Sequence, residues 1–387
     1  MKIAYAVTVP ASAKSFLAGQ IRHLVESGHD VRLFARDEPL LQDVARDEGA
    51  SAVGLPFERE ISPRADLIAL LATWRSFRAF RPDVASVGTP KAGLVGGLAA
   101  VFAGVPVRVY VLHGIRGEKA GGFKGRLLRL IERIACACAH KIVCVSPSVR
   151  DRGVELGFLS KRKAVVFGPG SANGVDMARF SEPPDAARLD GLRQQLGLAR
   201  GVKVIGFVGR FVRDKGVNEL ISAFAAIEHE RPEARLVMLG GFEDADPVGA
   251  ATRARIEQGG SIVWPGAVSD TADYYHLIDL LVLPTYREGF PTVCLEAAAA
   301  GVPVIATTAT GARDAVIHGV TGLLVEPGDA GGLATAMAEL LDDPERAKAM
   351  GRAGQDRVRT QFQPQRIWQS LEKLYLDLLA EKRGGRQ

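Results

Sequence analysis

Short apolar runs rich in Val, Ile and Leu alternate with helix-length segments along almost the whole chain. Parallel strands covered by helices on both faces have this pattern, so the alternation predicts an α/β fold. The predicted strands are Ile3–Val9, Asp30–Ala35, Asp83–Val87, Val105–Leu112 and Lys141–Val145, then Val202–Gly209, Ala234–Leu239, Ser261–Trp264, Asp279–Leu283 and Val302–Ala306. The predicted crossover helices include Leu17–Ser27, Asp66–Phe80, Gly125–Cys138 and Val217–Ile227.

The alternation stops between Asp176 and Gly201, in a charged stretch that contains two prolines and no strand-like run. A chain of 387 residues also exceeds the usual length of one domain. We therefore expect two doubly wound domains, over 1–180 and 201–363, joined by a linker over 181–200. A last helix over 364–387 follows Pro364 and can pack back on the first domain. Ligands of such domains bind at the carboxyl ends of the strands, here facing a central cleft.

Cysteine usage and the absence of an export signal predict a cytoplasmic protein. The four cysteines have no spacing typical of a disulfide framework or a metal site. The first residues lack the charged and apolar regions of a signal peptide. The longest uncharged run, Ala92–Val107, is shorter than the roughly 20 residues that a membrane span needs.

The charge of the chain is unevenly distributed. Residues 1–180 contain 26 Lys and Arg against 16 Asp and Glu, whereas the rest contains 23 against 28. A basic first half is consistent with an anionic partner, such as nucleic acid, an acidic membrane surface or a phosphorylated acceptor, and equally with scattered charge that keeps the protein in solution. A nucleic-acid binder would need stacking aromatic residues on that surface, and aromatic residues make up only 6% of the chain without forming a cluster. We therefore expect no nucleic acid as a partner.

The most specific motif runs from Arg287 to Glu296, between a predicted strand and a predicted helix. Backbone N–H groups at the start of that helix form a binding site for an anion such as a diphosphate. Glu288 in the loop and Glu296 in the helix can accept hydrogen bonds from sugar hydroxyls. Two carboxylates beside a diphosphate favour a nucleotide sugar over a bare nucleotide. Taken alone, either glutamate is also consistent with an ordinary carboxylate near a helix start.

A second motif, Gly206–Gly216, follows the first strand of the second half. Gly209 and Gly216 allow tight turns of the backbone. Arg210 and Lys215 provide two cations that can bind a diphosphate and stabilise the charge of a departing one. Taken alone, this segment is equally consistent with an exposed basic loop.

With these two motifs the chain resembles glycosyltransferase family 4, a retaining family with the GT-B fold. The resemblance extends over nearly the whole chain. It implies that Arg210 and Lys215 hold the diphosphate, that Glu288 contacts the donor sugar, and that Glu296 contacts the ribose. His113 matches a histidine that follows a strand in the family's first domain, although a lone histidine there is also consistent with a structural role. The further donor contacts that the resemblance implies are Gly209, Val268, Gly289, Phe290, Pro291, Thr292, Val293 and Leu295.

Three segments of the first half resemble a narrower branch, which extends polyprenyl-diphosphate-linked glycans with N-acetylhexosamines. These segments are Thr89–Leu94, Val111–Gly114 and Gly170–Asp176. In this interpretation the acceptor contacts are Ser12, Lys14, Lys91 and Arg116. A basic stretch can rest on anionic headgroups, each charge contributing about 1 kcal/mol near the surface, and is equally consistent with a solvated helix face. That stretch comprises Arg116, Lys119, Lys124, Arg126, Arg129 and Arg133.

The chain departs from the family pattern after the first strand, where Val9–Ser15 replaces a pair of glycines. The expected reaction is transfer from a UDP-sugar with no cofactor and no metal, and His113, Glu288, Arg210 and Lys215 are the predicted catalytic residues. An acceptor from specialised metabolism remains open in place of a lipid-linked one. A nucleotide-sugar epimerase with the same fold is an alternative of another class.

Overall fold

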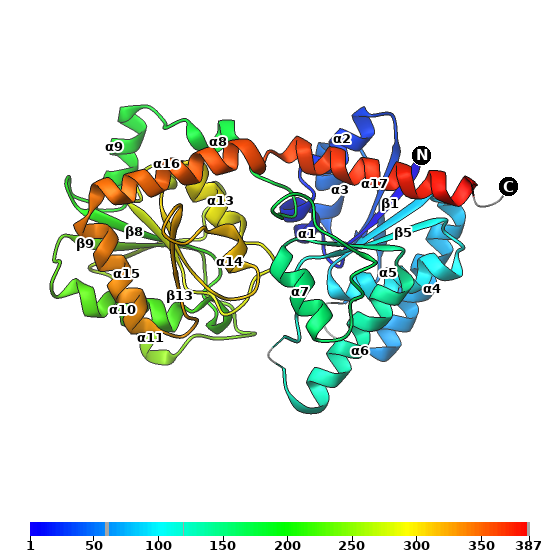
Figure 1. Cartoon of the computed structure of the whole chain (residues 1–387), viewed down its shortest axis with the longest axis horizontal. Helices are drawn as coiled ribbons and strands as arrows, with labels where there is room; N and C mark the ends of the chain where they lie inside the picture. Colours follow the sequence, from blue (N-terminus) through cyan, green and yellow to red (C-terminus); the bar gives the residue numbers. More distant parts are fainter. Residues whose placement is uncertain (59–61, 119, 385–387) are drawn as a thin grey trace. The chain divides into compact units, whose positions relative to one another are not determined.

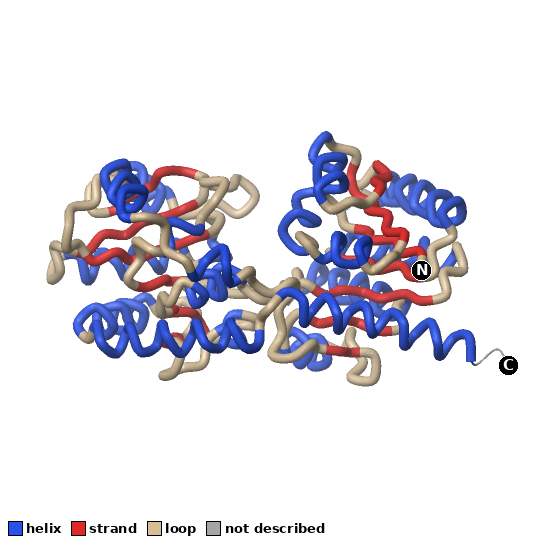
Figure 2. Tube along the Cα trace, turned by 90° about the horizontal axis from the view of Figure 1, so that it is seen from above, coloured by secondary structure: helices blue, strands red, loops and turns tan. Residues whose placement is uncertain are grey.

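The computed structural model describes residues 1–58, 62–118 and 120–384 of the chain. It divides into two compact units, of which the first holds Met1–Asn173 together with the C-terminal helix, and the second holds Gly174–Gln363 (Figure 1). Each unit is built on its own parallel sheet, with helices on both faces (Figure 2).

The first unit contains a sheet of seven strands in the order β3-β2-β1-β4-β5-β6-β7. The strands are β1 (Lys2–Ala6), β2 (Asp30–Arg36), β3 (Ser51–Leu55), β4 (Val84–Gly88), β5 (Val107–Leu112), β6 (Lys141–Cys144) and β7 (Ala164–Val165). The helices are α1 (Pro10–Phe16), α2 (Gln20–Glu26), α3 (Pro39–Asp47), α4 (Pro63–Phe80), α5 (Pro90–Phe102), α6 (Gly122–Cys138), α7 (Pro147–Glu155) and α17 (Pro364–Gly384).

The second unit contains a sheet of six strands in the order β10-β9-β8-β11-β12-β13. The strands are β8 (Lys203–Val208), β9 (Ala234–Leu239), β10 (Ile262–Gly266), β11 (Leu280–Leu283), β12 (Val304–Thr307) and β13 (Gly322–Val325). The helices are α8 (Met177–Ser181), α9 (Ala186–Gln195), η1 (Arg213–Lys215), α10 (Val217–Glu228), α11 (Ala250–Gln258), α12 (Ala272–Tyr275), α13 (Thr292–Ala299), α14 (Ala312–Ala315), α15 (Ala330–Asp342) and α16 (Pro344–Gln361).

The predicted α/β class is confirmed, and each predicted strand has a counterpart whose ends differ by a few residues. Three observed strands, β3, β7 and β13, were not predicted. All three lie at the edge of a sheet, where a strand has one neighbour and buries fewer side chains. They therefore lack the long apolar run that marks a central strand.

The division between the units falls after Asn173, before the expected boundary at residue 180. Val175 and Phe180 explain the difference, because both side chains are buried in the core of the second unit. Leu196 and Leu198, in the segment expected as a linker, belong to the same core. That segment therefore packs as part of the second unit.

Helix α17 packs on α2 and β5 of the first unit. Leu371 and Leu378 of this helix are buried in the core of that unit. The buried Tyr375 hydroxyl donates a hydrogen bond to Ser86 Oγ (2.8 Å) and lies 3.1 Å from the Tyr5 hydroxyl. The last segment of the chain thus completes the fold of the first unit.

Candidate functional site

The two motifs of the second half meet at one point of the second sheet. Strand β8 lies between β9 and β11, so the strand order changes direction between β8 and β11. Parallel α/β sheets bind their ligands outside the carboxyl ends of the strands at such a switch point. Gly209–Gly216 follows β8, and Arg287–Glu296 follows β11.

Asp214 ties these two loops together. Its carboxylate accepts a hydrogen bond from Arg287 Nε (2.8 Å). Its backbone carbonyl accepts from Tyr286 N (2.9 Å) and from Thr285 Oγ1 (3.0 Å). These contacts fix the loop after β11 against the loop after β8, so the side chains that follow are held close together.

Gly216 ends the 3₁₀ turn η1 and starts α10 with a positive φ of 68°. A Cβ atom at this position would lie 2.0 Å from the carbonyl oxygen of Pro284, just after β11. The close approach of the two loops therefore requires glycine here.

Lys215 and Glu288 form an ion pair at this junction, from Nζ to Oε1. Their side chains are 19% and 13% exposed, so the pair is largely shielded from water while still open to a ligand. Glu288 is held by its backbone N–H, which donates to Thr310 O (2.8 Å). The pair presents a cation and a carboxylate side by side.

Arg210 lies in the loop after β8, and its side chain is 60% exposed. Its Nη1 donates to Glu243 Oε2 (2.6 Å), in the loop after β9. An exposed ion pair of this kind contributes little to stability, so Arg210 can exchange its partner for an anionic ligand at small cost.

Glu296 lies inside the first turns of α13 and is largely buried. Its Oε2 accepts a hydrogen bond from the hydroxyl of Tyr275 (2.8 Å). Burial raises the pKa of Glu296, against the lowering effect of that hydrogen bond. Tyr275 was not predicted from the sequence, since nothing in the local pattern links it to a carboxylate in another helix.

The other predicted donor contacts lie in the loops after β10 and β11 and in the first turns of α13. Gly289, Phe290 and Pro291 form the loop before α13, and Thr292 and Val293 lie in its first turn. The Phe290 ring packs on Phe362, with centroids 5.5 Å apart. Two of the predicted side chains point into the protein: Leu295 is buried, and Val268, after β10, packs against the same core. Leu295 can therefore reach a ligand only through its backbone.

In the first unit, His113 follows β5 and stacks on Phe16, with ring centroids 4.3 Å apart. Its Nδ1 atom is buried and has no hydrogen-bond partner in the described part of the chain. Burial lowers the pKa of His113 to about 4, so the imidazole is neutral at physiological pH. A Cβ atom at Gly88 would lie 3.1 Å from His113 Nε2, which shows how closely β4 ends beside the ring.

The first sheet changes direction between β1 and β4. The loops that follow these strands are joined by the hydroxyls of Thr8 and Thr89, 2.7 Å apart. Thr89 has a positive φ of 68°, which is strained for a β-branched residue and is found mostly at functional positions. Sequence alone gives no signal for this conformation. The predicted acceptor residues Ser12 and Lys14 lie nearby in the chain, on α1.

Lys91 and Arg116, also predicted as acceptor contacts, line one small cavity of about 50 Å³. The cavity wall is otherwise mostly apolar, with Leu94 and Leu128 among its residues. Lys91 Nζ is 2.7 Å from Asp66 Oδ1, and its side chain is 8% exposed. Lys119 of the predicted basic stretch lies outside the described residues.

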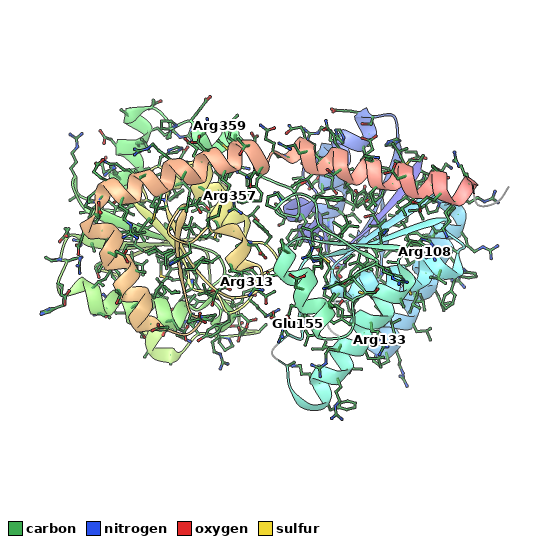
Figure 3. The ribbon with its side chains drawn as sticks, in the orientation of Figure 1. Arg108, Arg133, Glu155, Arg313, Arg357 and Arg359 are labelled. Atoms are coloured by element: carbon green, nitrogen blue, oxygen red, sulfur yellow. The ribbon has the colours of Figure 1, made fainter. Side chains whose placement is uncertain are left out.

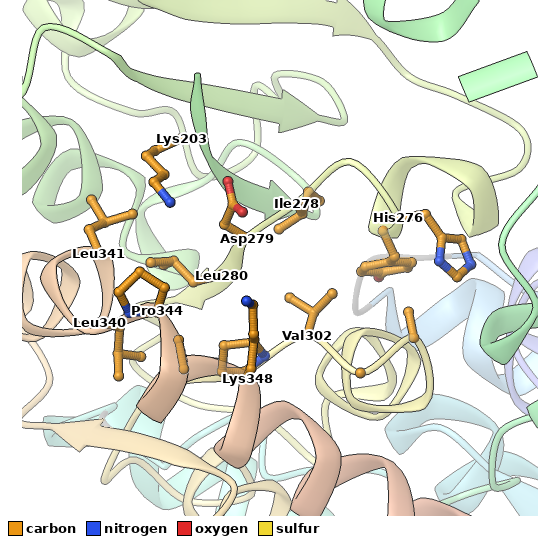
Figure 4. Close-up of a pocket in the computed structure, with 15 residues that line it drawn as sticks. Lys203, His276, Ile278, Asp279, Leu280, Val302, Leu340, Leu341, Pro344 and Lys348 are labelled. Atoms are coloured by element: carbon orange, nitrogen blue, oxygen red, sulfur yellow. The ribbon is translucent and has the colours of Figure 1, made fainter. Parts of the chain in front are cut away.

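A larger cavity of about 300 Å³ in the second unit is lined by Tyr275 but by none of the predicted site residues (Figure 4). Lys203, Asp279 and Lys348 line it, and the first two stand at the amino ends of β8 and β11. It is therefore at the opposite end of the strands from the switch point. Over the ranges that the structure describes, no group of three or more His, Cys, Asp or Glu could hold a metal ion.

Two family models match the chain. Residues 13–170 match the glycosyl transferase 4-like domain, and residues 190–357 match the glycosyl transferases group 1. The two matches correspond to the first and the second unit.

Named relatives cover nearly the full chain. The capsular polysaccharide biosynthesis glycosyltransferase CapM of Staphylococcus aureus is 34% identical over 383 residues, which are 99% of each chain. The UDP-Gal:alpha-D-GlcNAc-diphosphoundecaprenol alpha-1,3-galactosyltransferase of Escherichia coli is 25% identical, over 91% of this chain and 90% of the relative. The solved structure of Anabaena Alr3699/HepE in complex with UDP-glucose is similar in fold, with a TM-score of 0.82 at 21% identity over 97% of this chain and 100% of the other.

Proposed function

Because the chain belongs to the family 4 type of glycosyltransferases with the GT-B fold, we propose that it transfers a sugar from a UDP-sugar to a hydroxyl of a polyprenyl-diphosphate-linked saccharide. The proposed sugar is an N-acetylhexosamine or a hexose, transferred with retention of anomeric configuration at the cytoplasmic side of the membrane. The observation that carries the proposal is the Lys215–Glu288 pair at the β8/β11 switch point, with Glu296 in the helix that follows.

In the proposed binding of the donor, Lys215 and Glu288 give up their ion pair for contacts with the UDP-sugar. An incoming diphosphate offers Lys215 stronger negative charge than one carboxylate does, so Lys215 leaves Glu288 and binds phosphate oxygens. Glu288 is then released to accept hydrogen bonds from the hydroxyls of the sugar. Glu296, whose carboxylate accepts a hydrogen bond from Tyr275, is proposed to accept a second one from the ribose. The solved Anabaena relative contains UDP-glucose, which supports a uridine nucleotide as the donor.

Bond cleavage leaves negative charge on the departing UDP. Arg210 and Lys215, rather than a metal ion, are proposed to stabilise this charge as fixed cations. No side chain is assigned as general base; instead, an oxygen of the departing diphosphate takes the proton of the acceptor hydroxyl. His113 is neutral and donates or accepts a hydrogen bond near the reacting sugar, a role that its low pKa permits.

The proposed binding site for the acceptor lies in the first unit. Lys91 and Arg116 share one mostly apolar cavity, and Lys14 is exposed on α1. Cations beside apolar surface suit a diphosphate joined to a polyprenyl chain. The Escherichia coli relative is named for such an acceptor, and the Staphylococcus aureus relative is named for capsular polysaccharide biosynthesis.

The first test is thermal stabilisation by a panel of nucleotides and nucleotide sugars. A ligand at 100 times its Kd stabilises the folded protein by about 2.7 kcal/mol. We expect stabilisation by UDP or a UDP-sugar, loss of it in Glu296→Ala, and no loss in the control Glu257→Ala, which removes an exposed glutamate of α11. No response to any nucleotide sugar would refute the proposal.

The second test supplies the stabilising UDP-sugar with a polyprenyl-diphosphate-linked saccharide. Formation of a glycosidic bond with the anomeric configuration of the donor, read by NMR, is the expected result. Release of an epimerised nucleotide sugar without any acceptor would instead identify an epimerase. Transfer only to small aromatic or alicyclic alcohols would identify an enzyme of specialised metabolism.

A further inference from the structure

Among the residues that the structure describes, most of the large apolar side chains that the first unit exposes lie on two helices, α4 and α6. In α6 these residues are three or four positions apart, and in α4 two adjacent residues are followed by one three positions on, so each set forms a stripe along the solvent side. The α4 stripe consists of Leu67, Ile68 and Leu71, and the α6 stripe consists of Phe123, Leu127 and Leu130. Phe123 is the most exposed of them, at 82%. Contiguous exposed apolar residues indicate an interaction surface.

The two stripes belong to one layer of helices, in which α5 packs between α4 and α6 (Figure 1). Seven of the thirteen residues of helix α5 are buried, and six of these seven are Gly or Ala. A Cβ at Gly97 would lie 3.2 Å from Cβ of Cys138 in α6, which shows how closely these helices pack. The cavity of Lys91 and Arg116 is lined by all three helices, with Asp66 from α4, Leu94 from α5 and Leu128 from α6.

Exposed cations accompany both stripes. Helix α4 carries the exposed Arg64, Arg75 and Arg78, and α6 carries the exposed Lys124, Arg126 and Arg133 and the partly exposed Arg129. Arg133 can be followed on its helix (Figure 3). Each helix has a single acidic residue, and both are held inside. Asp66 pairs with Lys91 at 2.7 Å, and the buried Glu132 accepts from the Tyr110 hydroxyl at 2.9 Å. No exposed carboxylate therefore offsets the positive charge of the two helices.

We propose that the α4 and α6 stripes dock this protein on an anionic lipid bilayer, with Phe123 inserted among the acyl chains. Apolar side chains in one stripe with Lys and Arg around them are typical of helices that lie in the membrane interface. The cations bind the anionic headgroups. The basic stretch predicted from the sequence was confined to residues 116–133, whereas the structure adds α4 and the apolar component.

This inference deepens the proposed function and rests on it for one step. A polyprenyl-linked acceptor lies in the bilayer, and the cavity of Lys91 and Arg116 lies between the two stripes. Docking through both stripes would bring that cavity to the lipid surface, where the diphosphate of the acceptor resides. No helix in the described ranges is long and apolar enough to cross a bilayer.

The test is flotation of the full chain with vesicles of phosphatidylcholine alone and of phosphatidylcholine mixed with phosphatidylglycerol. We expect binding to the anionic vesicles, reduced but not abolished by high salt, because the apolar contacts are not screened. The triple variant Phe123→Ser, Leu127→Ser, Leu130→Ser should bind at least about tenfold more weakly, which is the loss expected for one fully inserted Phe side chain alone. The variant Lys124→Glu, Arg126→Glu should lose the preference for anionic vesicles.

The matched control is Ile317→Ser, Val320→Ser, which removes two exposed apolar side chains of the second unit. Absence of binding to anionic vesicles, or an equal loss in this control, would overturn the proposal. Self-association that only the triple variant abolishes, without vesicle binding, would identify a protein interface instead. UDP stabilisation is measured in parallel: its absence in a protein that still binds vesicles would refute the proposed function and leave the docking surface intact.

Discussion

The buried imidazole of His113 makes the stability of the first unit depend on pH below neutrality. Burial lowers the pKa of His113 to about 4, whereas an unperturbed histidine titrates near about 6.5. Between these values the unfolded chain binds a proton that the folded unit does not bind. Protonation of His113 therefore favours the unfolded chain. The free energy of unfolding is unaffected by this residue above about pH 6.5 and decreases as the pH falls towards about 4.

The size of the effect follows from the two pKa values. A difference of about 2.5 units corresponds to about 3 kcal/mol in total, of which about 2 kcal/mol is lost between pH 7 and pH 5. The variant His113→Phe keeps an aromatic ring against Phe16 and cannot titrate. We expect the free energy of unfolding to fall by about 2 kcal/mol less in this variant than in the parent protein over the same pH interval.

The assay is urea unfolding at pH 7 and pH 5, followed by circular dichroism. All other groups, including His140 with its own lowered pKa, titrate in both proteins and cancel in the difference. The exposed His229 provides the control, and His229→Gln should behave as the parent protein does. An equal loss of stability in His113→Phe and the parent protein would refute the reasoning. The variant is also expected to retain UDP binding and lose transfer; if both are lost together, His113 has no specific role in transfer.

Four further substitutions test the remaining structure. Gly216→Ala should destabilise the second unit by about 1–3 kcal/mol in thermal unfolding, because its Cβ would lie 2.0 Å from Pro284 O at a positive φ; an unchanged Tm would contradict the close approach. Lys215→Met and Arg210→Met should each weaken UDP binding about tenfold by calorimetry, since each removes a charged hydrogen-bond donor, while uridine binding stays unchanged; a matching loss for uridine would exclude a diphosphate contact. Tyr375→Phe should cost about 1–3 kcal/mol by leaving buried hydroxyl partners unsatisfied; a neutral effect would argue against the buried network.

Much of the candidate site could be predicted from the sequence because it lies in loops that follow strongly apolar strands. Lys215 and Glu288 were found in this way, and the rule that parallel strands end at one edge brings their loops together. Their ion pair was not predicted, since it joins residues far apart in the chain. The hydroxyl of Tyr275 on Glu296 was missed for the same reason. The positive φ of Thr89 has no sequence signal at all, because glycine usually occupies such positions.

The α/β class and the two series of strands and helices could be predicted from the amino-acid sequence, because they follow from the local period of apolar residues. The short edge strands, the packing of α17 on the first unit and the exposure of the apolar stripes of α4 and α6 depend instead on contacts between distant parts of the chain. A stripe of apolar residues three or four apart has the same pattern whether it packs in a core or lies exposed. Which of the two it does depends on the neighbouring elements, and these are set by the packing of the whole unit.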